Sequence, residues 1–151
     1  GPRHDGHVDV SDNDPSWGGA AGAVVSTAQD WSRFYIALMS GKLFPAAQLA
    51  QLRTTVPQDL TQPNGPGYGL GIQIGATPCG TIWGHDGGLP GYLTSNATDS
   101  TGSRTASLLV STELWAEFSV DQQLTDAAHA LQTAMICTMF DKPVPMTAHA
   151  R

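Results

Sequence analysis

The stretch Cys79-Gly-Thr-Ile-Trp-Gly-His85-Asp-Gly-Gly88-Leu-Pro-Gly-Tyr92-Leu carries the strongest structural signal in this chain. It predicts a strand that ends in a His-x-Gly triplet, followed by a tight Gly/Pro turn and a second strand. A glycine at a strand edge has no Cβ, so another backbone can approach within hydrogen-bonding distance. The triplet therefore indicates a site at which the backbone of a substrate lies against a sheet.

The segments on either side of this stretch follow strand and helix patterns. Strands are predicted at residues 68–74, 80–85, 91–97 and 104–112. Apolar spacing and capping residues predict one helix that begins within residues 26–30 and ends at Gly41, a shorter helix after Pro45, and a third at residues 120–140. Helices before and after an antiparallel strand meander predict an α+β fold, an antiparallel sheet flanked by helices.

The length of 151 residues fits one domain, or part of a larger one. Residues 1–19 are predicted to be a polar loop or linker, and Gly1 and Pro2 match the scar of a cleaved expression tag. Residues 20–142 are predicted to form the folded domain. Residues 143–151 are predicted to be a tail, because Pro143 and Pro145 cannot continue the last helix.

Charge and hydropathy exclude nucleic-acid binding and a membrane-spanning helix, and the composition indicates a location. Only 13% of the residues are charged and the net charge is −6, so the chain lacks the basic face that nucleic-acid binding requires. No apolar run approaches the roughly 20 residues of a membrane-spanning helix. Sparse charge with abundant Ala, Gly, Thr and Ser resembles the composition of secreted enzymes from high-GC bacteria, so an extracellular location is expected.

The two cysteines, Cys79 and Cys137, lie far apart in the sequence and in no metal-ligand spacing. They predict no zinc site, and no cofactor is expected. Two interpretations remain: a pair of buried free thiols, or a disulfide that ties the strand of His85 to the C-terminal helix. The secreted composition favours the disulfide.

Several stretches together carry a family resemblance. They are residues 17–30, 37–43, 46–51, 67–72, 84–87, 91–92 and 109–112. In this joint pattern the chain resembles the C-terminal part of a serine D-alanyl-D-alanine carboxypeptidase, of the penicillin-binding kind related to class C β-lactamases and their esterase relatives. The resemblance implies the C-terminal portion of a β-lactamase/transpeptidase-like fold, and acyl transfer through an acyl-enzyme on peptide-like or ester substrates, β-lactams included.

The resemblance also shows what the chain lacks. Such enzymes carry a Ser-x-x-Lys nucleophile motif and a Tyr-x-Asn motif, and neither occurs here. Ser11-Asp12-Asn13 spells a related triplet, but it lies in the polar N-terminal loop, past the place of the second motif, and we interpret it as coincidence. We therefore expect this chain alone to be inactive. The nucleophile would lie in a missing N-terminal part, either a truncated segment or a second chain.

The resemblance assigns roles to four residues of the expected site. His85 would lie beside the nucleophile, where an imidazole can exchange a proton near neutral pH. The backbone N–H of Gly88 would form one half of an oxyanion hole. Gly87 would leave space for the substrate, and Trp17 would line the cleft wall.

Two departures from the family pattern bear on the substrate. The middle position of the triplet usually carries a hydroxyl that binds a terminal carboxylate; here it is Asp86, which would repel one. An Arg that binds the same carboxylate is replaced by Gln73. Both changes raise the weight of the alternative, an esterase, amidase or D-aminopeptidase of the same family that acts on a neutral or cationic leaving group. A carboxypeptidase remains the first expectation, because the other segments are closest to carboxypeptidases.

Two readings from other classes stay open. The chain could be a non-catalytic binding or pseudo-enzyme module that lost its nucleophile. A metal-binding module is the other reading, with His4, Asp5, His7 and Asp9 as ligands. An EF-hand calcium loop starting at Asp9 fails, because the loop positions that need Gly and Glu carry neither residue.

Overall fold

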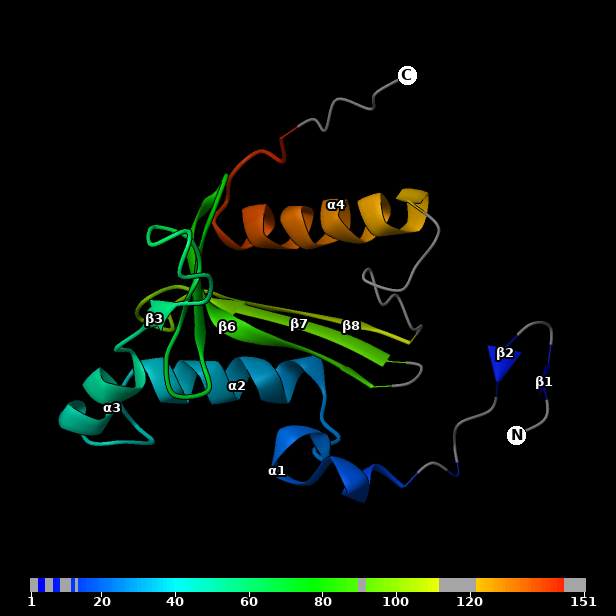
Figure 1. Cartoon of the computed structure of the whole chain (residues 1–151), viewed down its shortest axis with the longest axis horizontal. Helices are drawn as coiled ribbons and strands as arrows, with labels where there is room; N and C mark the ends of the chain where they lie inside the picture. The colour runs from blue at the N-terminus through cyan, green and yellow to red at the C-terminus, as the bar shows by residue number, and fades with distance from the viewer. Residues whose placement is uncertain are drawn as a thin grey trace.

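The computed structural model describes residues 3–4, 7–8, 12, 14–89, 92–111 and 122–145 of the chain (Figure 1). Its helices are η1 (Pro15–Gly18), α1 (Gly19–Gly22), α2 (Ala28–Met39), α3 (Ala46–Leu52) and α4 (Gln122–Met139). Its strands are β1 (Arg3–His4), β2 (His7–Val8), β3 (Val56–Pro57), β4 (Gly67–Tyr68), β5 (Gln73–Thr77), β6 (Gly80–Leu89), β7 (Tyr92–Thr98) and β8 (Thr105–Val110). No helix in these ranges is long and apolar enough to cross a bilayer.

The centre of the fold is a six-stranded antiparallel sheet with the order β3-β4-β5-β6-β7-β8. Helix α2 covers one face of the sheet and α4 covers the other (Figure 1). Each helix buries an apolar stripe against its own face. The stripe of α2 packs with Trp83 and Ile72, and the stripe of α4 packs with Ala97 and Ile82. The predicted α+β class is confirmed; the domain boundaries at 19/20 and 142/143 stay predictions.

Local sequence signals fix both ends of α2. The hydroxyl of Thr27 accepts a hydrogen bond from the backbone N–H of Asp30, which satisfies one of the free donors at the start of the helix. At the other end the Lys42 N–H donates to the Ala37 carbonyl, and Gly41 has a φ of 75°. This is a Schellman ending, in which glycine takes the left-handed conformation without steric cost. The predicted limits of this helix are confirmed.

The predicted strand over residues 68–74 is wrong. The segment forms β4 and β5, a tight hairpin in which Tyr68 pairs with Gln73. Gly71 sits in the turn with a φ of 75°, which lets the chain reverse where an unbroken strand was expected. The short strand β3 was not predicted at all, because two residues carry no periodic pattern.

Two further predictions need correction. Strand β6 continues to Leu89, so the triplet lies inside the strand and not at its end, because pairing with β7 persists to Leu89 and Tyr92. The N-terminal segment predicted as a loop contains β1, β2, η1 and the start of α1 within its described residues. In η1 the carboxylate of Asp14 accepts from the Ser16 N–H, a local capping signal that polar composition alone does not reveal.

The predicted disulfide is present. Cys79 and Cys137 are bonded with their Cα atoms 5.1 Å apart, and the bridge closes a sequence separation of 58 residues. Both cysteines are buried, in the core on the α4 face. The bridge joins the start of β6 to the last turns of α4, so it anchors the strand that carries His85.

Gly84 lets β6 and β7 lie close together just before His85. A Cβ at Gly84 would overlap the backbone oxygen of Asn96, whereas a Cβ at Gly75 would meet nothing within 4 Å. We expect Gly84→Ala to lower the free energy of unfolding by at least about 2 kcal/mol, since a backbone atom cannot move aside cheaply. The matched control Gly75→Ala should stay within about 1 kcal/mol of wild type. Urea unfolding measures both; equal effects would contradict the close approach.

Candidate functional site

Strand β6 extends beyond its neighbour on one side. The last residue pair between β5 and β6 joins Gln73 to Gly84, while pairing between β6 and β7 continues to Leu89. The segment from His85 to Leu89 therefore has a strand partner on its β7 side, and no described strand pairs with it on the β5 side. We call this side of residues 85–89 the open edge.

The open edge presents backbone groups of Asp86 and Gly88. The side-chain amide of Asn96 in β7 donates to the carbonyl oxygen of His85 at 3.4 Å, so the peptide groups of His85 face β7. Peptide groups alternate in direction along an antiparallel strand. Those of Asp86 and Gly88 consequently face the open edge, as an oxyanion donor at Gly88 requires.

Side chains of β6 divide between the two helical faces. Trp83 packs with α2, and because side chains alternate along a strand, His85 and Gly87 lie on the same face. Ile82 packs with α4, so Asp86 lies on the α4 face. The sheet thus separates the imidazole of His85 from the carboxylate of Asp86, although the two residues are adjacent in sequence.

The imidazole of His85 is held at both ring nitrogens. Its Nδ1 contacts the carbonyl oxygen of Asp86, which can only accept, so Nδ1 carries the proton. The other nitrogen, Nε2, lies 2.9 Å from the hydroxyl of Tyr68. In the neutral ring Nε2 therefore accepts from Tyr68, and the two rings pack edge to face with centroids 5.7 Å apart. His85 is half-buried, so its ring is oriented yet accessible.

Sequence reasoning missed Tyr68. The β4–β5 hairpin brings it beside β6, and this hairpin was predicted as one strand. The available signal was its place between Gly67 and Gly69, where a lone aromatic residue stands in a tight, glycine-rich turn. A Cβ at either glycine would crowd its neighbours, Thr55 at Gly67 and the Leu52 carbonyl at Gly69, so the tight packing positions the phenol.

We expect Tyr68→Phe to lower kcat/KM of the parent enzyme, the longer protein proposed below, about fivefold. One hydrogen bond to the imidazole is lost, which is worth about 1 kcal/mol. The matched control is Tyr92→Phe on β7, whose phenol is exposed, and it should leave kcat/KM unchanged. Steady-state kinetics tests both. Equal losses in the two variants would show that Tyr68 does not act through His85.

Two buried polar side chains lie near His85, Asn96 in β7 and Tyr35 in α2. Asn96, only 4% exposed, pairs with His85 across the sheet, and among the described protein atoms its Oδ1 has no hydrogen-bond partner. Burial raises the pKa of Tyr35 in α2 to about 12; the charge of Asp86 adds to the rise and the His85 backbone amide opposes it. Tyr35 is thus a neutral phenol near neutral pH and no candidate base.

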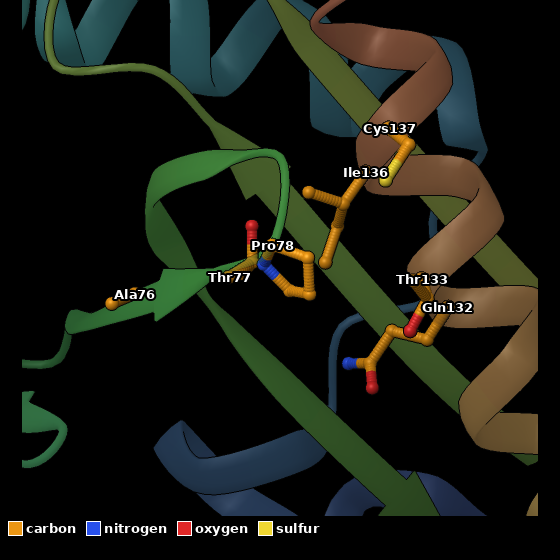
Figure 2. A pocket seen from close by; sticks show the side chains of 7 residues that line it. All are labelled: Ala76, Thr77, Pro78, Gln132, Thr133, Ile136 and Cys137. Carbon is orange, nitrogen blue, oxygen red and sulfur yellow. The ribbon is translucent and has the colours of Figure 1, made fainter. Parts of the chain in front are cut away.

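Asp86 is exposed, and its carboxylate is contacted from α4. The side-chain amide of Gln132 donates to Asp86 Oδ2 at 3.3 Å and to the hydroxyl of Ser95 at 2.8 Å. Gln132 also lines a cavity of about 150 Å³ between the β5–β6 turn and α4. Figure 2 shows its side chain extending away from the helix, with Pro78 and Ile136 on the other walls.

The remaining site predictions concern Gly87 and Trp17. A Cβ at Gly87 would lie 3.2 Å from the hydroxyl of Thr94, so the position is tight toward β7. Trp17 is 63% exposed in η1. A Cβ added at Gly22 in α1 would lie 3.6 Å from the side chain of Leu89 at the end of β6. The role of Trp17 as a cleft wall stays a prediction.

The proposed metal ligands His4, Asp5, His7 and Asp9 have side chains outside the described residues. Within the described ranges, no group of three or more His, Cys, Asp or Glu residues could hold a metal ion.

Two comparisons with known proteins bear on the family and the fold. The family model "Beta-lactamase" matches residues 1–130. Among solved structures, a D-stereospecific amidohydrolase from Streptomyces sp. is similar, with a TM-score of 0.62 and 33% sequence identity. The match covers 76% of this chain and 32% of that chain, so the present sequence spans about a third of the amidohydrolase.

Proposed function

Because this chain belongs to the Beta-lactamase family of serine hydrolases, we propose that it forms one wall of an acyl-transfer cleft in a D-stereospecific amidase. The amidase takes precedence over the carboxypeptidase expected from sequence for two reasons. The similar solved structure is a D-stereospecific amidohydrolase. In addition, Asp86 stands where a carboxypeptidase binds a carboxylate, and an ionised carboxyl there opposes that substrate.

The observation that carries the proposal is the open edge beside an oriented imidazole. The peptide groups of Asp86 and Gly88 have no strand partner on that side, and the ring of His85 is fixed by Tyr68. An extended substrate backbone can add to this edge as a further strand. The N–H of Gly88 then points at the carbonyl oxygen of the scissile bond, where negative charge develops.

The reaction we propose has two balanced steps. A serine Oγ from the part of the enzyme that this sequence does not include attacks the carbonyl carbon and loses its proton to a base. The C–N bond breaks, and the leaving amine takes a proton. Water then attacks the acyl-enzyme, which releases the carboxylic acid and restores the serine. Both ring nitrogens of His85 are bonded, so His85 acts on these steps through the hydroxyl of Tyr68, which is bonded to its Nε2. Gly88 stabilises the oxyanion in each step.

The proposed partner of this chain is the N-terminal part of the same enzyme, as a preceding segment or a second chain. Large apolar side chains lie exposed between α1 and α2, where Val24 is 76% and Val25 is 86% exposed. Strand β8 has no described partner on its outer side. An exposed strand edge and exposed apolar side chains are typical of surfaces that another part covers. A monomeric sedimentation profile without binding of a hydrophobic dye would contradict this partner.

We also propose an extracellular location. The disulfide between Cys79 and Cys137 supports it, because such bonds persist in oxidising compartments.

Matched substrates test the proposed activity. The parent enzyme should hydrolyse D-phenylalanine amide much faster than L-phenylalanine amide. A second pair of substrates is a peptide that ends in a D-alanine amide and the same peptide with a free D-alanine carboxylate. The enzyme should cleave the bond before the terminal D-alanine faster in the amide. The reverse order in the second pair would restore the carboxypeptidase interpretation. No turnover of any of the four would contradict the proposal.

A further inference from the structure

The α4 side of the open edge carries an uncompensated negative charge. Asp86 is exposed, and the ion pairs among the described residues join Arg33 to Asp30 and Arg104 to Asp141, so neither involves Asp86. The group that contacts its carboxylate is the neutral amide of Gln132. An amide donor orients a carboxylate without cancelling its charge.

Gln132 is itself fixed in place. Its Nε2 bonds to Ser95, which pairs directly with Asp86 across β6 and β7. One amide group from α4 thus bridges two neighbouring side chains of the sheet. This limits the rotamers of Asp86 and keeps its carboxylate on the α4 face, beside the open edge and on the opposite face from His85.

A substrate strand added to the open edge brings a side chain next to Asp86. The described sheet is antiparallel throughout, and antiparallel pairing is slightly the more stable arrangement. With the scissile carbonyl at Gly88, the residue before the bond lies opposite Gly88, and the residue after it lies opposite Gly87, one position from Asp86. Opposed L-residues share a face of the sheet, so an L side chain opposite Gly87 would lie on the α2 face with His85. A D-residue there presents its side chain to the α4 face, where a long basic side chain reaches Asp86 and the opposite charges attract.

The next inference rests on the proposed function. We propose that Asp86, which Gln132 orients, is a specificity-determining residue. Its carboxylate recognises a positively charged side chain on the leaving-group residue of the substrate. The chemical class is a D-configured peptide or amide with a basic residue immediately after the scissile bond. Gln132 is a positioning residue, because it acts through Asp86 and touches no reacting atom.

Three dipeptide amides test this inference. Each has D-phenylalanine first and then D-lysine, D-norleucine or D-glutamate, and the release of the second residue is measured with the parent enzyme. We expect kcat/KM for lysine to exceed that for norleucine by about threefold to fivefold, with glutamate slowest. The lysine preference should fall as salt is raised, because surface charges are screened.

The variants separate charge recognition from general damage. Asp86→Asn should bring the lysine to norleucine ratio to about one while norleucine turnover persists, and Gln132→Ala should give an intermediate ratio. Asp59→Asn, at an exposed carboxylate in the loop before β4, is the matched control and should keep the wild-type ratio. An unchanged ratio in Asp86→Asn overturns the inference and leaves the proposed function intact. A wild-type enzyme that hydrolyses none of the three, nor D-phenylalanine amide, would instead contradict the proposed function.

Discussion

Replacing His85 by Ala is expected to lower kcat/KM of the parent enzyme by a factor of about 10² to 10⁴, the usual contribution of a positioned proton-transfer group. The structure gives the physical reason. The ring stands on the α2 face of β6 beside the open edge, with Nδ1 held by the Asp86 carbonyl and Nε2 by Tyr68. An alanine removes the group that completes this wall of the cleft and leaves the phenol of Tyr68 unpaired.

Two further variants make the His85 result specific. His129→Ala, on an exposed position of α4, should leave kcat/KM unchanged. His85→Lys should keep more activity than His85→Ala, because a lysine ammonium can still form a hydrogen bond with the hydroxyl of Tyr68. Steady-state kinetics with D-phenylalanine amide measures all three. A His85→Ala enzyme within threefold of wild type would contradict the assigned role.

Replacing both cysteines by alanine should reduce the free energy of unfolding of the chain by about 4 kcal/mol. The bridge spans 58 residues of sequence, and a loop of this size costs the unfolded chain that much conformational entropy when it is closed. The effect should also reach the site, because the bond anchors the start of β6 to α4. We choose alanine and not serine because both cysteines are buried, and a serine hydroxyl there would be left without a hydrogen-bond partner.

Denaturant titration of the chain, with and without reductant, measures this loss. The reduced wild-type chain should reach its unfolding midpoint at about the same denaturant concentration as the Cys79→Ala/Cys137→Ala variant. Reductant should not change the midpoint of the variant. A variant as stable as the oxidised wild type would show that the bridge does not restrict the unfolded chain.

Features set by neighbours in sequence were predictable. The cap at Thr27 and the glycine ending at Gly41 act within a few residues, so the limits of α2 follow from the sequence. The disulfide was predicted for a different reason: only two cysteines exist, and the composition indicated an oxidising compartment.

Features set by the register of the sheet were not predictable. The contact between Tyr68 and His85 depends on a hairpin at Gly71, which the apolar pattern concealed within one apparent strand. The bond from Gln132 to Asp86 joins residues 46 positions apart. Which peptide groups face the open edge depends on where β5 stops, and no local pattern determines that point.

In the mechanism we propose, this chain supplies His85 and Gly88, and the attacking serine comes from another part of the enzyme. Labelling with a fluorescent fluorophosphonate locates that serine. We expect the 151-residue chain alone to take up no label, and the parent enzyme to be labelled at a serine outside this sequence. Stoichiometric labelling of a specific serine within this chain would contradict it.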